Sequence, residues 1–155
     1  MRWNQLATDL FAFYNDSCTV YVLRYGDRAL VVDFATGRWI EHLDEIGVRS
    51  VEYVVLTHAH RDQCCGLYRI GLGDWKLHAP AGDRALLAPE QHEQFWDIYQ
   101  HNGCPTNYAA PRLPLPEAVY DLHADGEVVL GPVRLCAIAT PGHTRGALTY
   151  LVEWN

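Results

Sequence analysis

The 155-residue chain is long enough to bury the core of one domain, and its net charge is −7, from 12 basic and 19 acidic residues. This charge argues against nucleic acid or an anionic membrane as an obligate partner. No apolar run approaches the roughly 18 residues that span a bilayer, and no signal peptide is evident. Five scattered cysteines without a C-x-x-C pair indicate free thiols in a reducing compartment. We therefore expect one cytoplasmic domain over residues 1–155.

The first third of the chain is rich in β-branched and aromatic residues between turn signals. We expect strands over Leu10–Tyr14, Cys18–Tyr25 and Arg28–Phe34, the last two joined by a Gly-Asp hairpin turn. Apolar residues at helical spacing predict a helix in "RWIEHLDEIG", which ends on a glycine. A continuous apolar run, Val51–Thr57, then predicts a buried strand. The order strand, helix, strand indicates a crossover and a fold of sheets layered with helices.

The middle of the chain differs from its two ends. Two short helices are expected in "GDRALLA" and "PEQHEQFWDIYQH", followed by an irregular connection over Asn102–Glu117 that holds four prolines. Strands return in "VYDLHADGEVVLG", "VRLCAIAT" and "ALTYLVEW". The chain is therefore expected to end, as it begins, in β-structure.

Side chains that bind metals gather directly after the strand Val51–Thr57. His58, His60 and Asp62 alternate there, and alternate residues of an extended segment point to one side. Far along the chain, His143 follows an apolar strand on a Pro-Gly turn. A single histidine at a strand end is usually solvated or packed into a core. Two histidines and an aspartate at strict alternation, together with His143, favour a metal site built from imidazole and carboxylate.

At these residues the chain resembles the metallo-β-lactamase fold superfamily. "THAHRDQCCG" and "TPGHTRGALTYLV" are similar to its His-x-His-x-Asp-His motif and its downstream Pro-Gly-His-Thr turn. "ALVVDFATG" resembles the family's strand that ends in an aspartate, and "LHADGEVVLGPVRLCAIATPGHT" its hairpin before the third histidine. The resemblance covers nearly the whole chain. It implies an α+β fold, the αββα sandwich, with a metal site between the edges of two sheets.

The resemblance also implies roles for individual residues. His58, His60 and His143 match the three-histidine metal site, and Asp62 matches the carboxylate of a second metal site. Asp33 matches the aspartate that braces the metal loop, a role that orients the ligands from behind. The alternative for Asp33 is an ordinary carboxylate at a strand end.

The first departure from the family pattern is Gln63, which stands where the motif has a histidine that binds the second metal. A carboxamide is a weak, neutral oxygen donor and does not replace imidazole equally for zinc. Gln63 is therefore expected to hydrogen-bond a ligand or a metal-bound water, or simply to begin the following helix. A fully loaded pair of metals is less expected than one metal.

The second departure lies after His143, where the chain has no further histidine or aspartate. Its last acidic residue, Glu153, is expected to be a solvated charge at a strand end. The family fold is then incomplete at the C-terminus and leaves a strand edge and an apolar face exposed. We expect a missing C-terminal segment or another chain, for example in a homodimer, to complete it.

Three histidines leave one coordination position open, as catalytic rather than structural zinc sites do. The expected function is a metal-dependent hydrolase that uses a metal-activated water on an ester, thioester, amide or phosphoester bond of a small molecule. Asp62 would hold a second metal or act as a base. The expected cofactor is zinc, as one or two ions, and iron or manganese also suits these ligands. The alternatives are a metal-binding but inactive interaction or assembly module, and a metal-free pseudo-enzyme.

Other residues are weaker candidates. Cys64 and Cys65 are expected either to form a vicinal disulfide or soft metal ligand, or to be two small residues packed at a helix start. Arg145 is expected to contact an anionic substrate or to be a surface charge. A lid over the metal, or ordinary amphipathic packing, is expected of three aromatic residues, Phe95, Trp96 and Tyr99.

Overall fold

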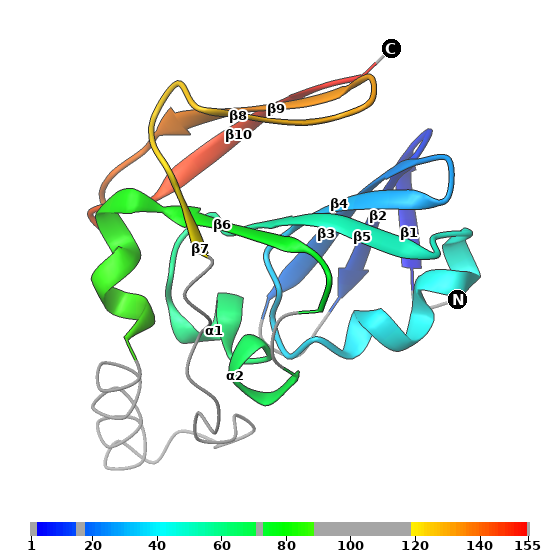
Figure 1. The fold of residues 1–155 in the computed structure, drawn as a ribbon, viewed down its shortest axis with the longest axis horizontal. Coiled ribbons are helices and arrows are strands. Elements are labelled where there is room, and N and C mark those ends of the chain that lie inside the picture. Colours follow the sequence, from blue (N-terminus) through cyan, green and yellow to red (C-terminus); the bar gives the residue numbers. More distant parts are fainter. Residues whose placement is uncertain (1–2, 15–17, 71–72, 89–118, 155) are drawn as a thin grey trace.

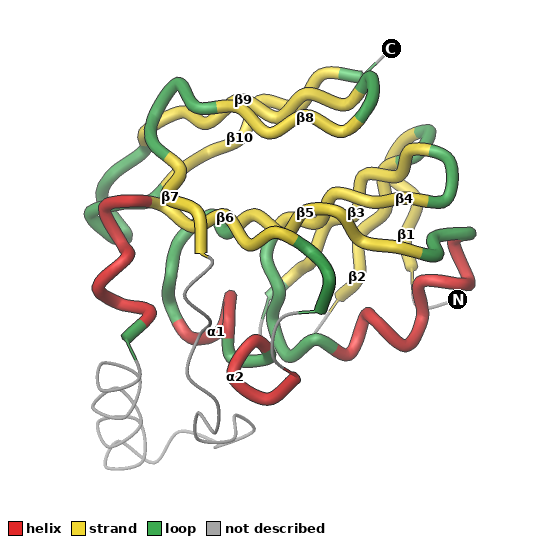
Figure 2. Tube along the Cα trace, in the orientation of Figure 1, coloured by secondary structure: helices red, strands yellow, loops and turns green. Residues whose placement is uncertain are grey.

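Two β-sheets face each other in the computed structural model, and the helices lie along the larger sheet (Figure 1). The residues that the structure describes are 3–14, 18–70, 73–88 and 119–154. The larger sheet has seven strands in the order β1-β2-β3-β4-β5-β6-β7, and the smaller has three in the order β10-β9-β8. Figure 2 shows the strands of both sheets in yellow, with the helices in red.

The large sheet consists of β1 (Trp3–Ala7), β2 (Leu10–Tyr14), β3 (Thr19–Tyr25), β4 (Arg28–Val32), β5 (Ser50–Val55), β6 (Lys76–Pro80) and β7 (Val119–Leu122). The small sheet consists of β8 (Glu127–Leu130), β9 (Val133–Ala139) and β10 (Leu148–Glu153). Two 3-10 helices, η1 (Arg38–Ile46) and η2 (Ala81–Leu87), and two short α-helices, α1 (Arg61–Cys64) and α2 (Leu67–Ile70), are described. None of the described helices is long and apolar enough to cross a membrane.

Strand direction in the large sheet decides where functional side chains can meet. Strands β1 to β4 pair antiparallel, whereas β4, β5, β6 and β7 pair parallel. The carboxyl ends of parallel strands lie at one edge of a sheet, which is where α/β folds place their ligands. The residues directly after β4, β5 and β6 therefore come together at this edge.

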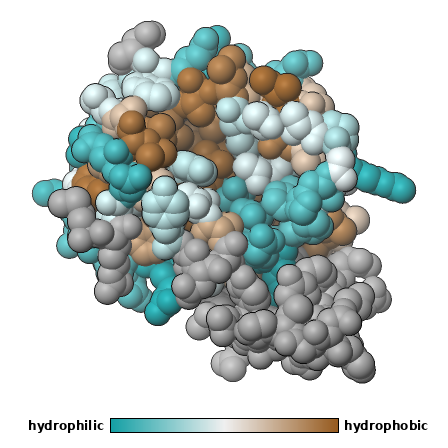
Figure 3. All heavy atoms as spheres, turned by 180° about the vertical axis from the view of Figure 1, so that it is seen from behind, coloured by the Kyte–Doolittle hydropathy of each residue, from teal (hydrophilic) through white to brown (hydrophobic). Residues whose placement is uncertain are grey.

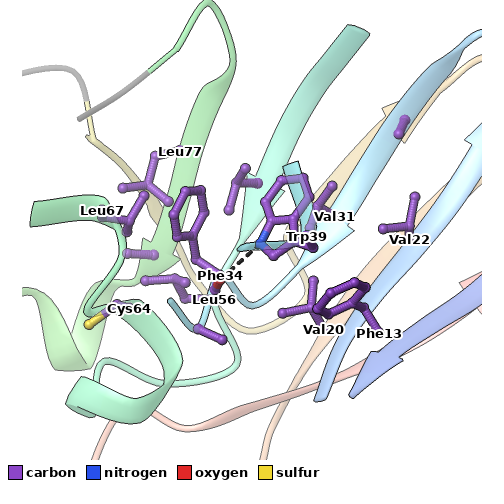
Figure 4. Packing of buried hydrophobic residues seen from close by; sticks show 14 of the residues in the cluster. Phe13, Val20, Val22, Val31, Phe34, Trp39, Leu56, Cys64, Leu67 and Leu77 are labelled. Atoms are coloured by element: carbon purple, nitrogen blue, oxygen red, sulfur yellow. Dashed lines mark hydrogen bonds between the residues drawn. The ribbon is translucent and has the colours of Figure 1, made fainter. Parts of the chain in front are cut away.

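The main core lies between the large sheet and the helices (Figure 4). Trp39 of η1 is completely buried, and its indole N–H donates to the carbonyl oxygen of Phe34 at 2.8 Å. The two rings meet edge to face, with centroids 5.3 Å apart. Burying an aromatic side chain of this kind contributes roughly 1.5–3 kcal/mol. This core holds the connection after β4 in place, and that connection begins with Asp33.

A second core joins the two sheets to each other. Leu30, Val55 and Leu135 are fully buried in it. Two hydrogen bonds also tie β10 to the end of β5, because the amide of Leu148 donates to the carbonyl of Thr57 at 2.8 Å and the Tyr150 hydroxyl donates to the carbonyl of Leu56 at 2.6 Å. The small sheet is thus fixed at the edge where β5 ends.

The outer face of the small sheet is exposed. Alternate residues of its strands point away from the second core, and Val129, Ile138 and Leu151 are each about half exposed, at 48%, 47% and 52%. No helix of the described part covers this face (Figure 1). Figure 3, seen from behind, shows hydrophobic side chains gathered in the upper part of the molecule, where the small sheet lies.

Most expectations about the fold are confirmed. The α+β class, the two facing sheets and the strands of both chain halves are present, with ends within two residues of the expected bounds for the first strands. The helix in "RWIEHLDEIG" exists but is of the 3-10 type. The strands β1 and β6 were not expected. For β6 the reason is that "KLHAP" lacks β-branched residues, although it lies between β5 and β7 in the sheet. The helix "PEQHEQFWDIYQH" and the connection Asn102–Glu117 lie outside the described residues.

Candidate metal centre

The first loop of the candidate site follows β5, at the carboxyl edge of the large sheet. Leu56 still bonds to the sheet through its amide, which donates to the carbonyl of His78 at 3.0 Å. The chain then leaves the sheet, with His58 and His60 on either side of buried Ala59. Helix α1 begins directly after His60, which has extended backbone angles of φ −69° and ψ 155°. The alternation expected from the sequence therefore holds for the two histidines.

The second loop joins β9 to β10 and carries His143. It closes on itself, because the amide of Thr140 donates to the carbonyl of Ala147 and the amide of Gly142 donates to that of Thr144, both at 3.0 Å. His143 is exposed on this turn, whereas His58 and His60 are half-buried. The tight turn thus projects a single imidazole toward the first loop.

The three histidines converge. One ligand atom of each of His58, His60 and His143 lies within 4.8 Å of the others, and the described residues place no carboxylate or thiol in this cluster. The ring centroids are 4.6–5.0 Å apart. His60 Nδ1 lies 2.9 Å from His143 Nε2, across 83 residues of sequence. The arrangement can hold a metal ion in the position that the sequence predicts.

The surroundings of His58 fit a metal ligand. Its Nδ1 lies 3.1 Å from the hydroxyl oxygen of Thr57, while its Nε2 is buried and has no hydrogen-bond partner among the described residues. A buried nitrogen without a partner costs free energy, which a bound metal would offset. Burial, and after it the neighbouring His60, lowers the pKa of His58. The neutral ring, which is the form that binds metals, is therefore favoured.

Asp33 stands behind His58. Its carboxylate accepts hydrogen bonds from the amide of Thr57 at 2.8 Å and from the Thr57 hydroxyl at 3.0 Å. Burial raises the pKa of Asp33 to about 7, although the hydrogen bonds from Thr57 act in the opposite direction. Asp33 also has a left-handed backbone, with φ 63°, which is uncommon outside glycine. The contacts form a chain from Asp33 through Thr57 to His58, the geometry expected of a brace.

Asp62 and Gln63 do not continue the extended segment, so the expectation of strict alternation through Asp62 was wrong. Both residues belong to α1, which changes the period of the side chains. The side-chain amide Nε2 of Gln63 donates to Asp62 Oδ2 at 3.1 Å. The backbone carbonyl of Gln63 accepts from the backbone amides of Phe34 and Ala35, both at 2.9 Å. The role of Asp62 at a second metal stays a prediction. Gln63 lies within α1, which begins two residues earlier at Arg61, and its expected contact with a ligand or a metal-bound water stays a prediction.

The cysteines near the site are free thiols. Cys64 and Cys65 are both buried and unbonded to each other, which is the packing alternative. The thiol of Cys64 donates to the carbonyl of His60 at 3.2 Å, and that of Cys65 to the carbonyl of Ala35 at 3.3 Å. Burial raises the pKa of Cys64 well above its ordinary value, so a metal-binding thiolate is disfavoured there.

The remaining candidates are easily placed. Arg145 is exposed on the His143 turn, and Glu153 is exposed at the end of β10, opposite Arg134 of β9. The aromatic residues of the proposed lid, Phe95, Trp96 and Tyr99, lie outside the described residues. Sequence reasoning missed Asp83, a buried carboxylate of η2 that contacts both histidine loops. Its one signal in the sequence is a Gly-Asp pair shortly after "KLHAP".

Comparison with solved structures finds the same fold in several metallo-β-lactamases. One from Cronobacter sakazakii, with an HARLDQ motif, matches 99% of this chain and 60% of its own at 20% identity and a TM-score of 0.76. BJP-1, a subclass B3 enzyme of Bradyrhizobium japonicum, matches 98% and 56% at 23% identity and a TM-score of 0.73. The di-zinc class B3 enzyme LRA-12 from an Alaskan soil metagenome matches 99% and 58% at 18% identity and a TM-score of 0.75.

The chain spans 56–60% of the length of these three solved chains. The HARLDQ motif ends in the same Asp-Gln pair as "HAHRDQ" in this chain. A comparison with curated proteins found no match. The sequence model of the metallo-β-lactamase superfamily matches residues 14–153, so the chain belongs to the metallo-β-lactamase superfamily.

Proposed function

We propose that the chain carries the metal-binding site of a hydrolase that acts on an ester, thioester, amide or phosphoester bond of a small molecule. One observation supports this most strongly. Three imidazoles from two loops, 83 residues apart in sequence, bring their ligand atoms within 4.8 Å of one another. Two half-buried histidines and an exposed one have no structural reason to converge in this way, and metallo-hydrolases use such tripods.

The proposed ligands are His58 through Nε2, His60 through Nδ1 and His143 through Nε2. The first of these atoms is buried without a hydrogen-bond partner among the described residues, and the other two lie 2.9 Å apart. A bound metal would supply Lewis acidity and lower the pKa of water to around 7. Three neutral nitrogens suit zinc first, and iron or manganese as well. One ion is proposed rather than two, because the described cluster holds three histidines and Gln63 replaces the imidazole of a second site.

The chain's own residues are assigned supporting roles. Asp33 and Thr57 fix the rotation of the His58 ring, because the Thr57 hydroxyl contacts both the carboxylate and the ring nitrogen. Asp62 is the proposed proton acceptor. Two observations support this role: the charge of Asp62 contributes to the pKa shifts of His58 and Asp33, and the side-chain amide of Gln63 donates to its carboxylate.

Hydrolysis can be tested with a panel of thioester, lactone, β-lactam and phosphodiester substrates, with zinc, manganese or iron added to the protein. The proposal predicts turnover of at least one class that stops when a chelator is added. His60→Ala should abolish this turnover, while Glu153→Gln, at the exposed end of β10, should retain it. Turnover that resists both the chelator and His60→Ala would rule out the proposed site.

A second candidate function is a metal-binding assembly module without catalysis. The exposed apolar residues on the outer face of the small sheet favour it, because such faces commonly contact another polypeptide. Strand β10 is also at the edge of that sheet, where a second copy of the chain could add a strand. Light scattering should then show a homodimer that Leu151→Lys disrupts, with metal binding intact in both forms.

The proposed compartment is the cytoplasm. The cysteines of the described part, Cys18, Cys64, Cys65 and Cys136, are all free thiols, which suits a reducing environment. We expect the protein to keep its stability when a thiol reductant is added.

A further inference from the structure

We infer that Asp83 is a positioning residue that joins the loop of His58 and His60 to the loop of His143, and thereby sets the affinity of the site for its metal. This inference rests on the proposed metal site. Asp83 lies in η2, which follows β6 at the same sheet edge at which β5 ends. Figure 1 shows the start of η2 beside the connection between β9 and β10.

The carboxylate of Asp83 contacts both loops. Its Oδ2 accepts hydrogen bonds from the amide of Ala59 at 3.1 Å and from the hydroxyl of Thr144 at 2.7 Å. Its Oδ1 accepts from the amide of Gly146 at 2.8 Å. One side chain therefore bonds to segments that lie 24, 61 and 63 residues away in the sequence.

Two of the three partners of Asp83 adjoin the proposed ligands in the sequence. Ala59 stands between His58 and His60, and Thr144 directly follows His143. A shift of the carboxylate would move these backbone positions relative to each other. Since metal sites tolerate errors of only a fraction of an ångström in ligand position, the separation between the two loops affects binding directly.

The backbone around Asp83 is fitted to the His143 turn. A Cβ atom added at Gly146 would lie 2.5 Å from the amide nitrogen of Asp83 and 2.7 Å from its Oδ1. A Cβ atom added at Gly82 would lie 2.8 Å from the Cα of Gly146. The start of η2 and the His143 turn are therefore in close contact through Gly82 and Gly146, which leaves the Asp83 carboxylate little room to change its distance from the turn.

Burial makes the contact strong. Asp83 is 1% exposed and Thr144 is 8% exposed, so their hydrogen bond is shielded from water. Burying a carboxylate is costly unless hydrogen bonds compensate, and charge-assisted bonds are about twice as strong as neutral ones. An aliphatic side chain would serve a purely structural contact at less cost. The directional bonds to both loops instead favour a role in placing the histidines.

The test measures zinc affinity by competition with a chromophoric chelator, together with the melting temperature of the metal-free protein. Asp83→Asn should weaken zinc binding by about 10–100-fold at a temperature at which the variant is fully folded. Thr144→Val, which removes only one donor, should weaken it by a smaller factor. Asp121→Asn is the matched control, since it removes an exposed carboxylate from the neighbouring strand β7 and should leave the affinity unchanged.

Asp83→Asn with wild-type zinc affinity and a lowered melting temperature would overturn the inference and leave Asp83 as a brace of the fold alone. If Asp83→Asn does not fold, Thr144→Val decides, and wild-type affinity in that variant overturns the inference. Absence of zinc binding by the wild-type protein would overturn the proposed metal site, and the positioning role with it. Equal weakening in Asp121→Asn would show a general effect of charge instead.

Discussion

The two loops that supply the histidines are held in different ways. The loop after β5 is part-buried, and Thr57 ties it both to Asp33 and, through its carbonyl, to β10. The turn that carries His143 is exposed, and Asp83 holds it through Thr144 and Gly146. The comparison indicates that the large sheet holds the first loop, whereas the turn of His143 depends on Asp83, which also bonds to Ala59 of the first loop.

The largest expected effect comes from removing a histidine of either loop. His58→Ala and His143→Ala should each lower zinc affinity by more than the roughly 10–100-fold that a supporting residue costs. The metal-free proteins should differ, because His58 is half-buried and bonded to Thr57 while His143 is exposed. We expect His58→Ala to lose about 1 kcal/mol of unfolding free energy and His143→Ala almost none. Urea unfolding measures the difference, and equal losses would contradict the asymmetry.

The next effect concerns the turn. Gly146→Ala should destabilise the protein by about 1–3 kcal/mol, since the added Cβ meets the backbone and carboxylate of Asp83. Zinc affinity should fall by about tenfold, because the His143 turn is displaced from the fixed loop. Arg145→Ala, at the exposed neighbouring position, should change neither quantity. A Gly146→Ala protein with unchanged stability and affinity would show that the turn is not held at Asp83.

A third prediction tests the first loop through the pH dependence of stability. The pKa of Asp33 is raised from 3.8 to about 7, so between these values the folded carboxyl holds a proton that the unfolded chain releases. The unfolding free energy of the metal-free protein should therefore fall as pH rises from about 4 to 7, by up to about 1.4 kcal/mol per pH unit. Asp33→Asn cannot titrate and should lack this component. Parallel stability curves for the two proteins would contradict the raised pKa.

Much of the site could be predicted because its strongest signals are local. Two histidines directly after a buried strand, and a third on a Pro-Gly turn, are visible in the sequence without knowledge of strand order. The place of Asp62 was predicted less well, because the chain enters α1 at Arg61 and the alternation ends there. The sequence does not show where a helix of four residues begins.

Asp83 could not be predicted, for a different reason. Its function depends on β6 lying next to β5, so that a residue after β6 reaches a loop after β5. The strand "KLHAP" has weak β-propensity and belongs to the sheet through its neighbours rather than its composition. A contact between segments that are 61 residues apart is fixed by topology and register, which local patterns do not encode.

The central claim is that His58, His60 and His143 bind a metal, and metal analysis of the purified protein tests it most directly. We expect about one transition-metal ion per chain by mass spectrometry after gentle purification, with zinc as the first candidate. His60→Ala, which removes the nitrogen that lies 2.9 Å from His143, should lower this content sharply. Clearly less than one ion per chain, unaltered by His60→Ala, would contradict the claim.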